Sequence, residues 1–290
     1  MSTTILYAWA NPLSGWHGAD HTWVTSYPAP FRCPPNADYW YCWGTCHPTG
    51  PGTTARALGS QAGDLAFAKC ICAPNDASAH GGIELYGIQG VCHQLANRIL
   101  YATGPAPLIV SNARMYWLSH ALFGTYGTTH VDWAKRRRDC APSAPGKGKG
   151  TKMNLNVNPD DTDDGDALAE VVRKQMGGQF TPEMAEKLAA LQQKLLSEKQ
   201  ELDKMVLAGR LSGREFAERV NLLLSRHVQR VAEVIGKENS AAIFGAEPGE
   251  ETVIVNPDIA ARVVYTTVSP SPSQGGTTAT GSSETGLAAN

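Results

Sequence analysis

Residues 90–101 read Gly-Val-Cys-His-Gln-Leu-Ala-Asn-Arg-Ile-Leu-Tyr and carry the strongest clue to the fold. Leu95 and Ile99 are four residues apart, which predicts the buried face of a helix. Cys92 falls in its first turn, where unpaired N–H groups and the positive end of the helix dipole stabilise a thiolate and lower the pKa of the thiol. The same N–H groups can form an oxyanion hole. Cys92 is therefore the candidate nucleophile.

Short β-prone runs precede this helix. Aromatic and β-branched residues bounded by Gly or Pro predict strands at residues 5–9, 21–27, 38–43 and 63–71. A second helix is predicted at 112–123. The pattern indicates an α+β domain over residues 1–139, a small antiparallel sheet with helices packed on it.

Gly90-Val-Cys92-His-Gln resembles the nucleophile helix of papain-like thiol hydrolases and their transglutaminase-like relatives. In these families a small residue and the Cys open a helix that packs on a sheet carrying a His. The resemblance covers about residues 1–135. It implies a thiol protease, amidase or acyltransferase that forms a thioester on a peptide, isopeptide or peptidoglycan-type amide, without a cofactor.

Two arrangements supply the histidine base. His21 opens a strand before Cys92, which is the order of circularly permuted papain-like families such as peptidoglycan-amidase-type and lecithin retinol acyltransferase-like proteins. His120 and Asp132 follow Cys92 instead, in the order of transglutaminase-like proteins. The strands before Cys92 favour the permuted order. His93 is expected at the surface, because it points about 100° away from Cys92 on the helix.

Aromatic side chains near the predicted strands, Trp23 and Trp43, are expected to line the substrate cleft. A metal site is the rival interpretation of this region. Zinc accepts four thiolate or imidazole ligands, and the candidates here are Cys42, Cys46, His47, Cys70 and Cys72. Their spacing differs from that of a regular zinc finger, so the main hypothesis has no metal and structural zinc is the alternative.

The remaining sequence divides into three parts. Residues 140–180 are polar, with an acidic run, and predict a flexible linker. Residues 181–245 predict an antiparallel helical hairpin, with an N-cap at Thr181 and a capping box from Ser212 to Glu215. Residues 246–290 predict short β-prone runs within 252–268 and then a disordered tail rich in Ser, Thr and Gly.

The hairpin cannot bury both of its apolar stripes alone. It must pack on residues 1–139, on a second copy, or on a protein partner. This need supports the alternative function, a non-catalytic interaction protein, with or without a zinc staple, whose hairpin docks a partner.

Overall composition narrows the function classes. Lys and Arg number 25 and Asp and Glu 27, a net charge of −2, which predicts no nucleic-acid binding. No apolar run is long enough to span a bilayer. The odd count of 7 cysteines, without a secretory signal, argues against a disulfide framework. A cytoplasmic location is expected, and signal-independent export stays open.

Overall fold

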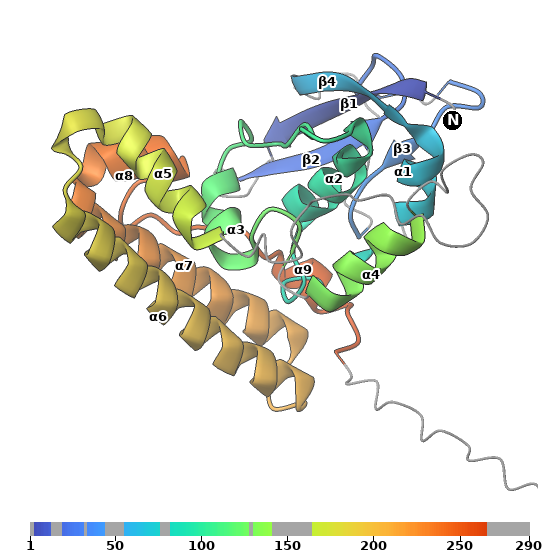
Figure 1. The fold of residues 1–290 in the computed structure, drawn as a ribbon. Helices are drawn as coiled ribbons and strands as arrows, with labels where there is room; N and C mark the ends of the chain where they lie inside the picture. Colours follow the sequence, from blue (N-terminus) through green and yellow to red (C-terminus); the bar gives the residue numbers. More distant parts are fainter. Residues whose placement is uncertain are drawn as a thin grey trace, which may run out of the picture.

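The computed structural model describes residues 3–12, 19–31, 34–43, 55–75, 82–127, 130–140 and 164–265. It has a mixed α/β fold, in which helices pack beside one small antiparallel sheet (Figure 1). The strands are β1 (Thr3–Pro12), β2 (Asp20–Thr25), β3 (Tyr39–Trp40) and β4 (Arg56–Asp64), in the order β3-β2-β1-β4. The strands predicted at 5–9 and 21–27 are confirmed, and the one predicted at 38–43 is present only as the two residues of β3.

Alternation along the strands separates the two faces of the sheet. Leu6 and Ala8 of β1 and Val24 of β2 are fully buried in the core. Helix α2 (Cys92–Leu100) packs against β2 on this side. Tyr7 and Trp9 point to the opposite face, because successive side chains of a strand alternate. The predicted sheet with a helix that begins at Cys92 is therefore present.

Two local predictions in this half are wrong. Residues 63–71 are not a strand: β4 ends at Asp64, whose carboxylate accepts the N–H groups of Ala66 and Phe67 and starts helix α1 (Leu65–Ile71). The helix predicted at 112–123 begins only at α3 (Tyr116–Phe123), because Met115 has a left-handed backbone with φ of 61°. In both cases one backbone or capping position moved the boundary.

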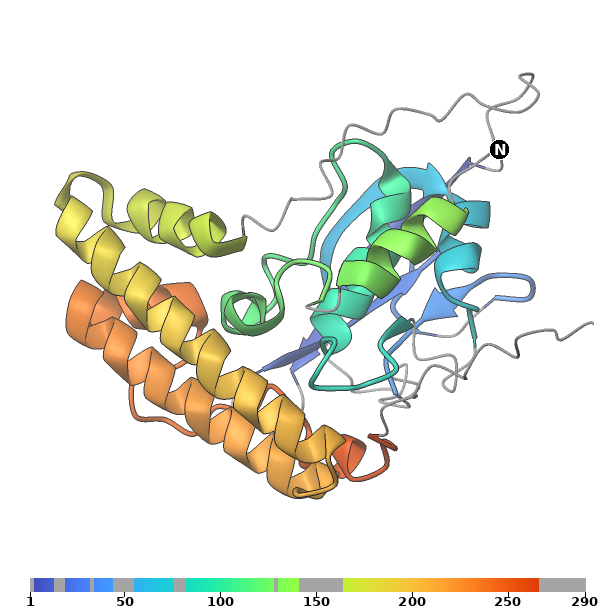
Figure 2. The same cartoon turned by 60° about the horizontal axis from the view of Figure 1, so that its bottom comes forward.

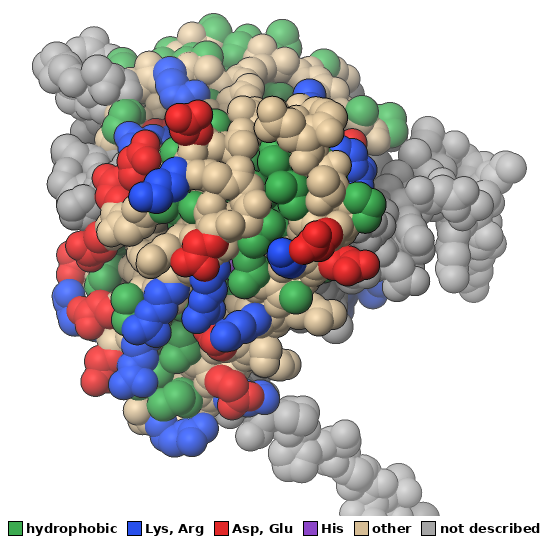
Figure 3. All heavy atoms as spheres, turned by 90° about the vertical axis from the view of Figure 1, so that its left-hand side faces the viewer, with side chains coloured by type: hydrophobic (Ala, Val, Ile, Leu, Met, Phe, Trp, Pro, Cys, Tyr) green, Lys and Arg blue, Asp and Glu red, His purple; other side chains and the backbone are tan. Residues whose placement is uncertain are grey.

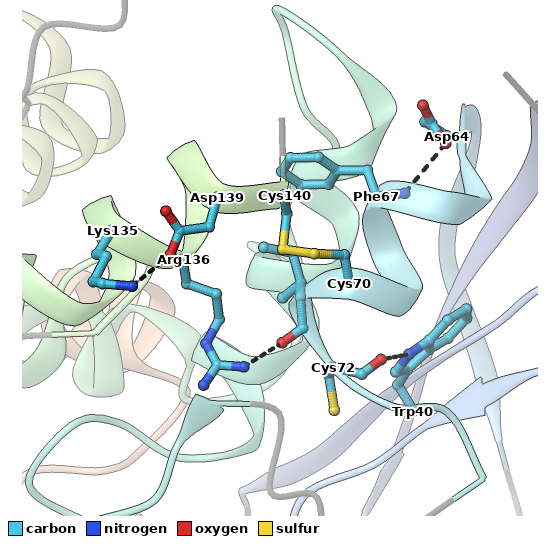
Figure 4. The surroundings of a disulfide bond; sticks show 10 residues. Trp40, Asp64, Phe67, Cys70, Cys72, Lys135, Arg136, Asp139 and Cys140 are labelled. Atoms are coloured by element: carbon cyan, nitrogen blue, oxygen red, sulfur yellow. Dashed lines mark hydrogen bonds and ion pairs between the residues drawn. A yellow bond between two sulfur atoms is a disulfide. The ribbon is translucent and has the colours of Figure 1, made fainter. Parts of the chain in front are cut away.

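A disulfide joins Cys70 near the end of α1 to Cys140 at the end of helix α4 (His130–Cys140), as Figure 4 shows. Arg136 of α4 also donates to the Ile71 carbonyl at 2.9 Å. The expectation that this chain lacks disulfides is therefore wrong. The two cysteines are 70 residues apart, and only the packing of α1 on α4 brings them together.

The linker predicted over 140–180 is wrong for its second half. Residues 164–176 form helix α5 (Asp164–Met176), followed by the short helix η3 (Gly177–Gln179). Leu168 and Val172 are buried, four residues apart, on the face of α5 that packs on α3 and on helix α8 (Lys237–Phe244). Residues 141–163 lie outside the described part of the chain.

The helical hairpin is confirmed as α6 (Pro182–Leu207) and α7 (Gly213–Ile235), which pack along each other (Figure 2). Thr181 caps α6, and Ser212 with Glu215 forms the predicted capping box of α7. The buried residues of the hairpin belong to the same core as the sheet. The chain itself thus supplies the surface on which the hairpin packs.

Residues 250–265 run back from the hairpin to the sheet-bearing half, and we call them the C-terminal strap. No strand forms in the described residues 252–265, so the β-prone prediction is wrong there; the strap contains helix α9 (Pro257–Ala260) instead. Asn256 caps this helix by accepting the N–H groups of Asp258 and Ile259. Figures 1 and 2 place α9 near the turn between α6 and α7.

Acidic and basic side chains mix on the face shown in Figure 3, with apolar atoms between them. Several charges on α6 pair within one turn, for example Lys187 with Glu183 at 2.7 Å. Across the part of the chain that the structure describes, none of the helices has the length and apolar character to cross a membrane.

Candidate functional site: a covered thiol at the start of helix α2

Cys92 is the first residue of α2, and its side chain is half-buried. The turn before it depends on Gly90, which has a φ of 145° and whose added Cβ would lie 2.7 Å from Cβ of Gln94. The Gln94 side chain reaches back to accept the Val91 N–H at 3.1 Å. Local sequence chemistry therefore fixes the start of the helix, and with it the position of the thiol.

Polar groups of β2 surround the sulfur. The main-chain N–H and hydroxyl of Thr22 and the N–H of His93 each lower the pKa of Cys92, and the Sγ atom lies 3.8 Å from the Asp20 carbonyl oxygen. Burial nevertheless has the largest effect and raises the pKa of Cys92 above its usual value. The expected low-pKa thiol is thus not what the structure shows.

The thiol borders a small cavity of about 20 Å³. This space holds about one water molecule and no acyl group of a substrate. One wall belongs to β2 and α2, another to Tyr86, and the last to the C-terminal strap. The complete lining is Ala19, Asp20, His21, Tyr86, Val91, Cys92, His93, Val253, Ile254 and Ile259.

His21, the predicted base, borders this same cavity. Its ring stacks on the indole of Trp23, with ring centroids 5.8 Å apart. Residues 21 and 23 share one face of β2, and Thr22, which contacts the thiol, faces the other way. The structure therefore brings His21 and Cys92 to one cavity but directs their side chains to opposite faces of the strand.

His93 is buried, so the prediction of a surface position is wrong. Its Nε2 lies 3.1 Å from the Asp20 carbonyl and its Nδ1 2.7 Å from the Ser119 hydroxyl. Burial lowers the pKa of His93 to about 4, so the ring is neutral at pH 7. A carbonyl only accepts, so Nε2 carries the proton, and Nδ1 faces the Ser119 hydroxyl, which also donates to the Tyr116 carbonyl at 2.9 Å. Both ring nitrogens of His93 are therefore in use.

Asp20 is the residue that the sequence did not single out. Its carbonyl faces both His93 and Cys92, and its buried carboxylate accepts the Arg114 N–H at 2.8 Å and pairs with Arg56 at 2.5 Å. These contacts join residues 36 and 94 positions away in sequence. The sequence could have pointed to Asp20 only if it had been known that β4 and the segment before α3 meet at the start of β2.

The other predicted site residues lie away from the cavity. His120 is buried in α3, with Nε2 3.2 Å from the Thr125 hydroxyl, and does not border the cavity. The backbone of Asp132 belongs to α4, but its side chain is outside the described residues. Trp23 is fully buried and donates to the Pro30 carbonyl at 3.0 Å. Trp43 is partly buried and donates to the Ile83 carbonyl at 2.6 Å.

The zinc alternative loses a ligand. Cys70 is bonded to Cys140, so it is not available as a thiolate, while Cys42 and Cys72 are buried thiols. Cys46 and His47 lie outside the described residues. Within the described ranges, no three His, Cys, Asp or Glu side chains form a group able to hold a metal ion.

Comparisons with protein-family models, with curated proteins and with solved structures gave no match. The evidence for a function of this site is therefore the geometry of its own residues.

Proposed function

We propose that the protein is a cysteine-dependent hydrolase or acyltransferase, with Cys92 as its nucleophile. The observation that carries this proposal is that Cys92 opens helix α2 and borders a cavity that His21 also borders, where the N–H groups of Thr22 and His93 lower the pKa of the thiol. Two main-chain donors beside a thiol can stabilise first the thiolate and then the oxyanion of a tetrahedral intermediate. The substrate class that we propose is a peptide, isopeptide or peptidoglycan-type amide.

The proposed reaction has two stages. Sγ of Cys92 attacks the carbonyl carbon while the base takes the thiol proton, and the carbonyl oxygen becomes an oxyanion held by N–H donors. The C–N bond then breaks, the departing amine takes the proton from the base, and a thioester remains on Cys92. Water or an acceptor amine attacks the thioester next, which releases the acyl product and returns the proton to the sulfur.

His21 is the base that we propose. The ring nitrogens of His93 face Ser119 and Asp20, and His21 is the second histidine that borders the cavity. Because its side chain lies on the face of β2 opposite Thr22, the backbone at His21 has to rearrange and the ring has to leave Trp23 before it can accept the thiol proton. A base within hydrogen-bond reach contributes about 10²–10⁴-fold to such a step.

The order of elements supports a permuted papain-like arrangement over a transglutaminase-like one. Strand β2, which carries His21, precedes α2 in the chain and packs directly against it. His120, the base of the other arrangement, is held inside α3 between the rings of Tyr116 and Trp117, at centroid distances of 5.7 and 5.2 Å.

Acylation by p-nitrophenyl acetate tests the proposed function. We expect an acetyl thioester at Cys92 by mass spectrometry of the full chain, absent in Cys92→Ala. We expect His21→Gln to slow this acylation at least tenfold at pH 7 and to have little effect above the pKa of the thiol, with His93→Gln as the comparison. Failure of Cys92 to acylate both in the wild type and in a variant whose cavity is opened, while other side chains acylate, refutes the nucleophile, and equal rates in His21→Gln refute the base.

A further inference from the structure

The C-terminal strap narrows the cavity beside Cys92. Val253, Ile254 and Ile259 of the strap form one wall of the roughly 20 Å³ space that the thiol borders. No acyl substrate fits while this wall is in place, because the space is that of about one water molecule. Any reaction of Cys92 with a carbonyl group therefore requires the strap to move.

Two residues of the strap fasten it to Tyr86, which also borders the cavity. The Asn256 N–H donates to the Tyr86 hydroxyl at 3.3 Å, and the Tyr265 hydroxyl donates to the Tyr86 carbonyl at 2.7 Å. Val255 fills the space beside Gly87, where an added Cβ would lie 2.7 Å from its methyl group. These contacts follow Val253 and Ile254 in the chain and flank Ile259 on both sides.

The hairpin holds the other side of the strap. Asn221 of α7 accepts the N–H groups of Ile254 and Val255, both at 3.0 Å, and donates to the Val255 carbonyl at 2.8 Å. The hydroxyls of Ser225 and Thr252 lie 2.7 Å apart. The strap therefore links the position of the hairpin to access at Cys92.

We propose that the C-terminal strap is an autoinhibitory cover, and that Cys92 becomes accessible to substrate only when the strap leaves Tyr86. This inference rests on the proposed function, since it assigns a regulation to the same thiol. Burial raises the pKa of Cys92, and Val253, Ile254 and Ile259 of the strap are among the residues that surround the thiol.

The variant Gly213→Ala opens the cover from the hairpin side. An added Cβ at Gly213 would lie 2.0 Å from the Ala260 carbonyl oxygen and 2.9 Å from the Tyr265 ring, so the strap must shift. Gly178→Ala is the matched control, because its Cβ would meet no atom within 4 Å. Tyr265→Phe is the milder variant, since it removes only the hydroxyl that bonds to Tyr86.

The measurement is the rate of iodoacetamide alkylation at each cysteine of the full chain, mapped by mass spectrometry at pH 8. We expect Gly213→Ala to raise the rate at Cys92 at least tenfold, Tyr265→Phe to raise it about two- to fivefold, and Gly178→Ala to leave it unchanged. Cys42 and Cys72 are buried thiols and serve as internal controls for global unfolding. Their rates should not change.

Two results would overturn the cover. One is an unchanged alkylation rate at Cys92 in both Tyr265→Phe and Gly213→Ala, although faster hydrogen exchange at the Ile254 and Val255 amides shows that the strap has loosened. The other is a parallel rise at Cys42, Cys72 and Cys92, which indicates general loosening. Acetylation by p-nitrophenyl acetate separates the two proposals. If Cys92 of Gly213→Ala is alkylated faster but is never acetylated, the proposed cover stands and acyl transfer is refuted. If wild type and Gly213→Ala are acetylated at equal rates, acyl transfer stands and the proposed cover is refuted.

Discussion

Loss of the disulfide between Cys70 and Cys140 should lower the free energy of unfolding by about 4 kcal/mol. The cysteines are 70 residues apart, so the bond closes a loop that contains all of α2 and α3. A cross-link of this span removes about 15 cal/mol/K of conformational entropy from the unfolded chain, which corresponds to about 4 kcal/mol at 25 °C.

The folded state should survive without the bond. Helices α1 and α4 remain in contact, and Arg136 still donates to the Ile71 carbonyl at 2.9 Å. The effect therefore falls mainly on the unfolded chain, which expands when the cross-link is absent. We expect the slope of the unfolding free energy against urea to rise as well, because more surface is exposed on unfolding.

Urea unfolding followed by tryptophan fluorescence measures both quantities. The samples are oxidised wild type, reduced wild type, and the double variant Cys70→Ala with Cys140→Ala in both conditions. Reductant should change the wild type and leave the double variant unchanged, which controls for effects on the other cysteines. A change below 1 kcal/mol, with an unchanged slope, would refute the loop-entropy reasoning.

A peptide map tests the pairing itself: alkylation of both Cys70 and Cys140 without prior reduction would show that the bond does not form. Disulfides persist in oxidising compartments. We therefore expect the chain to reach such a compartment, in contrast to the cytoplasmic location inferred from its first residues.

Three further predictions concern two buried titratable side chains and a helix cap. Burial lowers the pKa of His227 from 6.5 to about 4. The neutral ring therefore contributes its full stability above pH 6.5, and this contribution is lost as the pH falls toward 4. Between pH 7 and pH 4, the free energy of unfolding of wild type should fall by about 3 kcal/mol more than that of His227→Gln. Lys199 is buried and pairs with Asp203 at 2.5 Å. Lys199→Ala should lower the free energy of unfolding in urea by about 3–5 kcal/mol, whereas the double variant Lys199→Met with Asp203→Leu should stay within about 1 kcal/mol of wild type. A loss below about 1 kcal/mol in Lys199→Ala would contradict this. Ser212→Ala removes the cap of α7 and should lower the unfolding free energy by about 1 kcal/mol, with Ser212→Asn close to wild type.

Elements set by neighbouring residues could be predicted from the sequence. The caps at Thr181 and Ser212 and the apolar spacing after them gave the hairpin, and Gly90 with Leu95 gave the start of α2 at Cys92. Helix α5 also had a local signal in Leu168, Val172 and Met176, which repeat every four residues. The acidic residues before them obscured it, because composition alone suggested a linker.

Contacts between distant segments could not be predicted in the same way. The role of Asp20 depends on Arg114, 94 residues away, and the wall of the cavity depends on Ile254, which lies far beyond Cys92 in the chain. Spacing and propensity contain no information about which distant segments meet. The disulfide and the C-terminal strap therefore emerged only from the three-dimensional structure.

The opposite signs of the predicted and observed pKa shifts at Cys92 follow from the magnitudes of two effects. A helix N-terminus stabilises a negative charge by up to about 2 kcal/mol, or about 1.5 pKa units. Full burial can raise the pKa of an acidic group by about 3–5 units. The strap supplies part of that burial, and the sequence around Cys92 contains no trace of it. Displacement of the strap would leave the N–H groups of Thr22 and His93 beside a hydrated sulfur. The pH at which the alkylation rate of Cys92 reaches half of its maximum should therefore be lower in Gly213→Ala than in wild type.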